Sequence, residues 1–330
     1  SGDSLYQLLG DYTAPQEATM NDKTIYRQLK SVFSDSEVVY AEGCEVRNPE
    51  GQEEKISAAI ALAATADVIV LVLGGSSARN FDMEFLSNGA VSSKGINMDS
   101  GENVDVASLT LGGKQLDLLA ALAQLDKPIV SVIIQGRPYD LREVHAASRA
   151  VLIGWFPGQQ GGAAIARTLA GSNNPSGRLG VSYPLNSQQL PVYYYQRAAS
   201  KQDDYYDESG APLHEFGYGL SYTEFTYDNL QVTSDSDTIT VSVTVRNNGR
   251  CAGKESVLLF VRLLGGSVIQ RHKLLKDFVK VQLEPGQEQE ITLLLTTEQL
   301  SFTDLDRAVK AAAGCKVMVG NLSQEIYFKK

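Results

Sequence analysis

The chain has 330 residues, which is long for a single domain and suits two. Hydrophobic residues make up 43% and charged residues 21%, a normal balance for a globular protein. The formal net charge is −10 and no block of Lys and Arg occurs, which argues against nucleic acid as a partner. No apolar run reaches the roughly 20 residues that a membrane-spanning helix needs.

Residues 23 to about 185 alternate helix-like with strand-like segments. Helical spacing predicts helices at 23–33, 52–65, 114–125 and 163–170. Apolar runs predict strands at 37–40, 67–73, 128–134 and 150–155, and the last three are continuous, as in strands buried on both faces of a parallel sheet. We therefore predict an α/β fold, a layered and mostly parallel sheet with helices on both faces.

The first 22 residues are polar and turn-rich, although such a sheet usually opens with a buried apolar strand. We expect that the chain begins after that strand, inside a longer protein. The alternative is that the sheet starts with the short strand at 37–40. The opening residues Ser1-Gly2-Asp3-Ser4 are not a signal peptide, so a signal would lie upstream of this chain.

From about residue 227 the pattern is that of an all-β domain. Residues 238–245 alternate strictly between apolar and polar, as a half-buried strand does, and Asn247-Asn248-Gly249 follows as a turn signal. Further strands are predicted at 257–261, 290–295, 316–320 and 325–328. This spacing predicts an immunoglobulin or fibronectin III-like β-sandwich. The expected organisation is therefore an α/β domain over 1–185, an extended Tyr-rich linker over 186–226 and the sandwich over 227–330.

The common cofactor and metal patterns are not found. Three cysteines and three histidines are too sparse and too widely spaced for a metal site, and we expect none. There is no dinucleotide-binding glycine motif, no P-loop and no nucleophile elbow. A nucleotide-binding α/β enzyme is therefore the least supported interpretation, and no cofactor is expected.

The best candidate for chemistry is a long loop after the strand at 67–73. It runs from 76 to 113 and follows the carboxyl end of a central strand, where α/β folds place ligands. Its acidic residues can each also be read as solvated loop charges, and they are Asp82, Glu84, Asp99, Glu102 and Asp105.

Motifs along nearly the whole chain resemble the C-terminal portion of glycoside hydrolase family 3. Each is weak alone, but their order and spacing together are specific. They include Gly75-Ser-Ser-Ala-Arg79, Asp99-Ser-Gly-Glu-Asn-Val-Asp105, Trp155-Phe-Pro-Gly158 with Gly161-Gly162, Asn174-Pro-Ser-Gly-Arg-Leu179, Phe216-Gly-Tyr-Gly-Leu-Ser-Tyr222 and Glu284-Pro-Gly286.

The resemblance implies the C-terminal part of a retaining exo-β-glycosidase of β-glucosidase or β-xylosidase type. It implies that Glu102 is the general acid/base, and that the aspartate nucleophile belongs to an N-terminal (β/α)8 barrel of the same protein, so that this chain alone is inactive. The partners are a β-glycoside or oligosaccharide and that barrel, and the compartment is periplasmic or secreted. Substrate-binding roles are expected for Arg79, Asp82, Glu84 and Asp99.

One position departs from the family pattern. Where many relatives have Asp-Arg after the glutamate, this chain has Asp105-Val106, so a charge partner for the loop is missing. Either Arg79 or Lys94 replaces it, or the loop is held differently. Arg178 is expected to be structural. The alternative function is a non-catalytic carbohydrate-binding or scaffold module, which explains the sandwich and the tyrosines but not the acidic loop.

Overall fold

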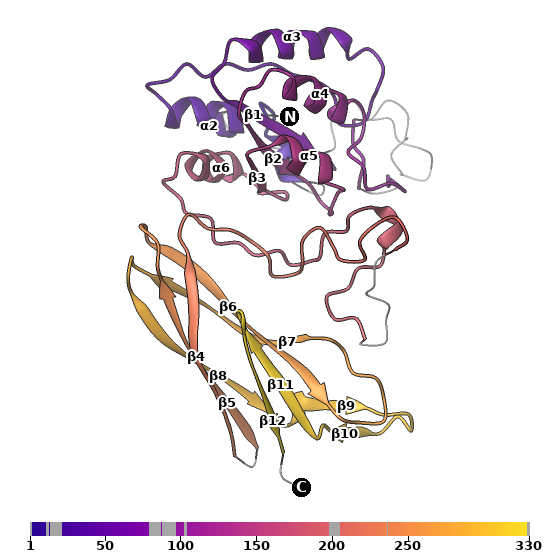
Figure 1. Ribbon diagram of the computed structural model, residues 1–330. Helices are drawn as coiled ribbons and strands as arrows, with labels where there is room; N and C mark the ends of the chain where they lie inside the picture. Colours follow the sequence, from indigo (N-terminus) through magenta and orange to yellow (C-terminus); the bar gives the residue numbers. More distant parts are fainter. Residues whose placement is uncertain are drawn as a thin grey trace. The chain divides into compact units, whose positions relative to one another are not determined.

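The computed structural model describes residues 2–10, 13, 22–78, 87, 97–101, 104–197, 205–235 and 237–328. The chain forms two compact units (Figure 1). The α/β unit comprises Ser1–Asn173 and Pro184–Leu190, and the sandwich unit comprises Asn174–Tyr183 and Pro191–Lys330. The segments predicted from the sequence, 1–185, 186–226 and 227–330, divide the chain differently, because residues 174–190 alternate between the two units.

Three parallel strands form the sheet of the α/β unit, in the order β1-β2-β3. Their bounds are β1 (Ile69–Gly74), β2 (Ile129–Ile134) and β3 (Ala150–Ile153). In β2, Val132 and Ile134 join an apolar cluster with α2 and α6. Ser131 points to the opposite face, where its hydroxyl lies 2.7 Å from that of Ser148 at the end of α5. The sheet is therefore covered by helices on both faces, as predicted.

Six helices of the α/β unit are described. They are α1 (Tyr6–Leu9), α2 (Ile25–Val32), α3 (Glu53–Ala64), α4 (Gln115–Ala123), α5 (Arg142–Ala147) and α6 (Gly161–Leu169). The side chain of Thr24 accepts a hydrogen bond from the Arg27 amide and so caps the start of α2. Gly162 permits the close packing of α6 on this start, since a Cβ there would lie 2.2 Å from the Lys23 carbonyl oxygen.

The predicted strand at 37–40 is not formed. This segment has no ladder partner within the described residues, and Val39 and Tyr40 are exposed. A short apolar run becomes a strand only beside a partner that bonds its peptide groups, and composition alone does not supply one. The helices predicted at 23–33, 52–65, 114–125 and 163–170 and the other three strands are confirmed, whereas α1 and α5 were not predicted.

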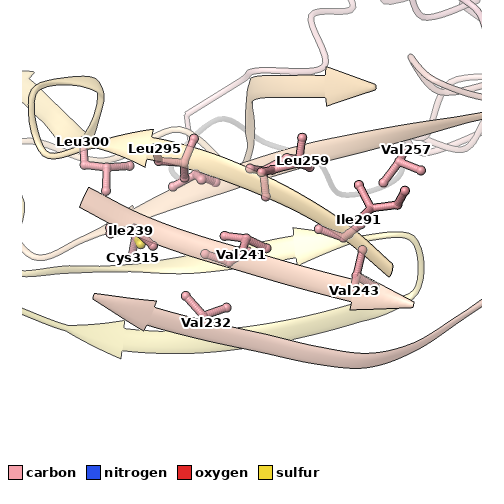
Figure 2. Close-up of a cluster of buried hydrophobic side chains, with 14 of the residues drawn as sticks. Val232, Ile239, Val241, Val243, Val257, Leu259, Ile291, Leu295, Leu300 and Cys315 are labelled. Atoms are coloured by element: carbon pink, nitrogen blue, oxygen red, sulfur yellow. The ribbon is translucent and has the colours of Figure 1, made fainter. Parts of the chain in front are cut away.

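The sandwich unit is built from two antiparallel sheets, β12-β11-β6-β7 and β4-β5-β8. In β5 the strict sequence alternation becomes strict alternation of burial. Figure 2 shows the apolar side chains between the sheets, among them Val241, Leu259 and Ile291. The strands are β4 (Phe225–Ser234), β5 (Thr238–Asn247), β6 (Gly253–Leu264), β7 (Leu274–Leu283), β8 (Glu288–Thr296), β9 (Ser301–Thr303), β10 (Val309–Ala311), β11 (Gly314–Val319) and β12 (Leu322–Tyr327). The predicted fibronectin III-like sandwich is confirmed.

A buried ion pair ties the chain ahead of the sandwich to β6. Arg178 pairs with the carboxylate of Glu255, which also accepts a 2.7 Å hydrogen bond from the Tyr227 hydroxyl. Burial and the negative charge of Glu255 raise the pKa of Tyr227. The expectation that Arg178 is structural agrees with these contacts.

The Tyr-rich segment before β4 packs through its own aromatic rings. Tyr194 stacks on Phe216 with ring centroids 4.2 Å apart and contacts Phe260 of β6 edge-on, all within the sandwich unit. Tyr206, in contrast, is fully exposed.

Candidate functional site

The candidate site lies where β1 and β2 end. Strands of a parallel sheet end at one common edge, and the loops that follow them there supply most ligand-binding residues in α/β folds. Here β1 leads into Gly75-Ser76-Ser77, and β2 leads into the segment from Gln135 to Tyr139. The far end of the long acidic loop returns to the same edge at residues 97–101.

Asp99 is the centre of this edge, and it is 3% exposed. Its Oδ1 accepts a 2.8 Å hydrogen bond from the Ser76 amide, and its Oδ2 accepts a hydrogen bond from the Tyr139 hydroxyl. Burial and the adjacent Asp99 raise the pKa of Tyr139. With both oxygens engaged inside the protein, Asp99 joins the loop to β1 and β2.

Gly75 is required for this arrangement. A Cβ at this position would lie 1.9 Å from the Tyr139 hydroxyl oxygen and 2.6 Å from the Asp99 carboxylate. The backbone of the loop therefore passes directly against the two side chains, which only a residue without a side chain allows. This is the structural reason for glycine in the Gly75-Ser76-Ser77 stretch.

The residues on either side of Asp99 are also fixed. The Asn97 side-chain oxygen accepts hydrogen bonds from the amides of Val46 and Arg47, at 2.8 and 3.1 Å. Met98 is fully buried. The Val104 amide donates to the Gly101 carbonyl at 3.2 Å. Glu102 lies between these two bonded residues in the sequence but outside the described part of the structure, as do Arg79, Asp82, Glu84 and Lys94.

Arg137 pairs with Asp105 across the site edge. The guanidinium of Arg137 and the Val106 amide lower the pKa of the Asp105 carboxyl. A cation from the loop after β2 therefore pairs with an aspartate of the acidic loop. Neither Arg137 nor Tyr139 was predicted as a site residue, although the Gly136-Arg-Pro-Tyr139 turn directly follows a buried strand.

Gln115, the first residue of α4, closes the base of the site. Its side-chain amide donates to the Gly74 carbonyl and accepts from the Gly74 amide, both at 2.8 Å. It also donates to the Val46 carbonyl at 3.2 Å. One buried side chain thus holds the end of β1, the segment at 46 and the start of α4 together.

Within the described residues, no group of three or more His, Cys, Asp or Glu is arranged to hold a metal ion. No helix in this part of the chain is long and apolar enough to cross a membrane. The arrangement is an edge of the sheet at which hydrogen bonds and buried side chains hold residues 97–101.

Comparison with known proteins identifies the family. The model of the glycosyl hydrolase family 3 C-terminal domain matches residues 3–222, and that of the fibronectin type III-like domain matches residues 255–323. The chain belongs to glycosyl hydrolase family 3. The match to the family 3 C-terminal domain covers nearly all of the α/β unit and continues into residues 191–222 of the sandwich unit, and the predicted resemblance is confirmed.

Similar family 3 proteins are longer than this chain. The chain is 28% identical to a periplasmic beta-glucosidase of Salmonella typhimurium over 94% of its length, and 32% identical to a beta-xylosidase of Formosa agariphila over 91%. It spans 42% and 39% of these two relatives. A solved structure of a beta-glucosidase from Listeria innocua in complex with isofagomine matches 99% of the chain with a TM-score of 0.83 and 28% identity, and the match covers 45% of that protein.

Proposed function

We propose that this chain is the C-terminal part of a retaining exo-β-glycosidase that removes terminal β-linked glucose or a related sugar. Glu102 supplies the general acid/base, and the nucleophile is an aspartate on an N-terminal (β/α)8 barrel. One observation carries the proposal: in a family 3 chain, Asp99 before Glu102 and Asp105 after it are bonded to the loops that follow β1 and β2.

The hydrogen bonds made by the residues on either side of Glu102 support this role. A retaining glycosidase needs two carboxyl groups about 5–5.5 Å apart across the scissile bond, so each must be held in place. Asp99 fixes the loop three residues before Glu102, and the bond from Val104 to Gly101 spans it. Fixed positions on both sides of a catalytic residue reduce the conformational freedom that is lost on substrate binding.

The chemistry assigns one carboxyl group to each side of the substrate. The barrel aspartate attacks the anomeric carbon, and the leaving oxygen departs with the proton of Glu102. Glu102 then takes a proton from the water that releases the sugar. Glu102 must be protonated before the first step, so contact with the barrel or substrate must raise its pKa.

The relatives support the substrate class and the compartment. Their names describe beta-glucosidases and a beta-xylosidase, one of them periplasmic. We therefore propose a β-glucoside or β-xyloside as substrate and an exported enzyme. Arg79, Asp82 and Glu84 are proposed to contact the substrate from the same loop, and Asp99 to act from behind it through Ser76 and Tyr139.

The test compares wild type with Glu102→Ala in the complete protein, barrel included, on two aryl β-glucosides. One has a good leaving group and the other a poor one. We expect roughly a 10²–10⁴-fold loss on the poor leaving group, since it needs protonation, and a much smaller loss on the good one. Added azide, which needs no general base, restores rate on the good leaving group.

Asp105→Ala is the matched control, because it removes a carboxylate from the same loop that is already paired with Arg137. It is expected to affect both substrates equally. Equal and small losses with Glu102→Ala would contradict the proposed role and leave Glu102 as a solvated loop charge. An intact protein that binds sugars but shows no hydrolysis would favour a non-catalytic carbohydrate-binding module.

A further inference from the structure

Two arginines lie directly opposite each other in the sandwich unit. Arg197 and Arg271 form an antiparallel bridge, and the His272 amide beside it donates to the Gln196 carbonyl at 2.8 Å. This bond makes the two arginines a non-hydrogen-bonded pair, in which the Cα atoms are only about 4.5 Å apart. Like charges that face each other in such a pair repel, so the arrangement lowers the stability of the unit.

Both guanidinium groups are left with donors to spare. Arg197 Nη1 donates to the Ile269 carbonyl at 2.8 Å, and Arg271 Nη1 donates to the Tyr195 carbonyl at 3.0 Å. Within the described residues, neither guanidinium forms an ion pair with a carboxylate. A guanidinium carries several N–H donors in a planar fork, so most donors of the pair remain available to another partner.

This local excess of positive charge contrasts with the rest of the chain, whose formal net charge is −10. The neighbouring cation Lys273 is already paired with Glu215, at 2.6 Å, so the excess comes from the two arginines. Sequences depart from a local rule of this kind chiefly where function requires it. Paired arginine forks match the oxygens of a carboxylate or a sulfate, which makes an anion the partner that would relieve the repulsion.

An exposed aromatic ring lies next to the arginine pair. The Tyr193 side chain is 52% exposed, and its ring stacks on that of Tyr195 with centroids 5.2 Å apart and an interplanar angle of 18°. The guanidinium carbon of Arg271 lies 4.8 Å from the centre of the same Tyr195 ring. One intermediate ring therefore connects the exposed ring with the cations.

The stacked tyrosines are anchored in the sandwich. The Tyr195 ring meets Tyr194 edge-on at 5.2 Å, and Tyr194 in turn stacks on Phe216 and contacts Phe260 of β6. A ring that is held in this way loses little conformational freedom when a ligand binds. The apolar face of a sugar ring presents C–H groups, whose slight positive charge is attracted to the negative face of an aromatic ring such as Tyr193.

We propose that Tyr193, Arg197 and Arg271 form a binding site for an anionic saccharide, in which a sugar ring carries a carboxylate or a sulfate group. The sugar ring packs on Tyr193, and the anionic group receives N–H donors from the two arginines. All three residues belong to the sandwich unit. The site does not depend on Glu102, so this proposal and the proposed hydrolysis can fail separately.

The test is isothermal titration calorimetry of the pure chain with three saccharides of equal length: an oligogalacturonide, a sulfated oligosaccharide and a neutral gluco-oligosaccharide. We expect at least one anionic ligand to bind about tenfold or more tightly than the neutral one, since hydrogen bonds to charged groups are the stronger ones. Its affinity should fall as salt is added. Whichever anionic ligand binds more tightly identifies the preferred group.

Arg197→Gln and Arg271→Gln are each expected to weaken anionic binding by about tenfold or more, because each removes charge-assisted donors. Tyr193→Ala removes the ring and should weaken it by about threefold or more. Lys280→Gln is the matched control, since it removes one positive charge from an exposed position of β7, and it should change the affinity by less than about twofold. Without ligand, neither arginine variant should lower the melting temperature, since the repulsion is relieved.

Three outcomes would overturn the proposal. The first is that neither anionic saccharide binds more tightly than the neutral one. The second is that Lys280→Gln weakens binding as much as the arginine variants do, because the attraction is then general and not local. The third is that inorganic sulfate binds as tightly as the saccharides and Tyr193→Ala has no effect, since the arginines then hold an anion without a sugar.

Discussion

The two units of this protein differ in how completely each one encloses its own hydrophobic surface. In the sandwich unit, every second residue of β5 up to Val245 is almost inaccessible to solvent, and β6 and β11 follow the same rule. In the α/β unit, α3 buries no residue and β1 exposes Val68 and Val70. The difference shows that the sandwich encloses its own apolar surface, whereas the α/β unit leaves apolar surface of β1 and α3 open to solvent.

The candidate functional site belongs to the α/β unit, whose apolar surface is less completely enclosed. The candidate site lies at the carboxyl edge of this sheet, and hydrogen bonds of Asp99, Tyr139 and Gln115 hold it. Under the proposed function this site accepts a barrel and a sugar, and such a site is not enclosed by its own domain. The four predictions below test this difference between the α/β unit and the sandwich unit.

The largest expected effect concerns catalysis by the chain alone. Because the proposed nucleophile lies on the barrel, the pure chain should release no aryl alcohol from an aryl β-glucoside, whereas the complete enzyme should. The assay is release of the chromogenic group against a buffer blank. Hydrolysis by the pure chain above that blank would mean that a full catalytic set lies within these 330 residues.

Glu255→Ala should destabilise the sandwich unit by about 3–5 kcal/mol, because it leaves the Arg178 charge buried without its partner. The free energy of unfolding of the sandwich unit is measured by chemical denaturation. Glu290→Ala, an exposed carboxylate of β8, is the control and should change it by no more than about 0.5 kcal/mol. Similar effects of the two variants would show that the ion pair is not needed.

Truncating one apolar residue in each unit tests the difference in closure. Leu259→Ala should cost about 2–5 kcal/mol, since this side chain is fully buried between the two sheets. Ile60→Ala on α3 should cost about 1 kcal/mol or less, because the side chain is only half-buried. Unfolding of each unit is followed in separate denaturation curves. Equal costs would contradict the claim that the α/β unit is open.

The smallest effect is kinetic and concerns two thiols. Burial raises the pKa of Cys44 in the α/β unit and of Cys315 in the sandwich from 9.0 to about 11. Both remain protonated at pH 8, where the thiolate fraction is roughly a hundredfold smaller than in the unfolded chain. Alkylation should therefore accelerate as the pH rises from 9 towards 11, and peptide mapping separates the two sites.

The two thiols differ in how accessible they are to solvent. Cys44 is partly exposed, so it should react from the folded state, whereas Cys315 is fully buried and should react only when the sandwich opens. A thiol whose folded-state pKa is raised stabilises the fold below its ordinary pKa, and this contribution is lost as the pH rises through 11. Equal alkylation rates would contradict this difference in access.

The sequence predicted the elements whose patterns are regular. The apolar runs of β1 and β2 and the alternation of β5 are confirmed within a residue or two. β4 was missed because the register shifts between Asp228 and Gln231 and Asn229 has a positive φ of 55°, which interrupts alternation. The segment at 37–40 has a strand's composition but no partner, and local composition does not reveal partners.

The site was predicted only in part, for a related reason. Asp99 belongs to an acidic loop that its own composition and length marked as functional. Tyr139 and Arg137 lie more than 30 residues further along the chain and meet the loop only because β1 and β2 are neighbours in the sheet. Which strands are neighbours is decided by the whole fold. A single stretch of sequence therefore does not show which loop residues meet at the end of the sheet. The role of Glu102 stays a prediction.

The alternation of residues 174–190 between the units has a consequence for cutting or recombining the gene. A break at residue 174 leaves the α/β unit without Ser187, whose hydroxyl accepts a 2.9 Å hydrogen bond from the Leu109 amide. A break at residue 191 leaves the sandwich without Arg178 and so leaves the Glu255 carboxylate unpaired. No single breakpoint yields both units whole, so the two units can be exchanged between relatives only together or with a duplicated segment.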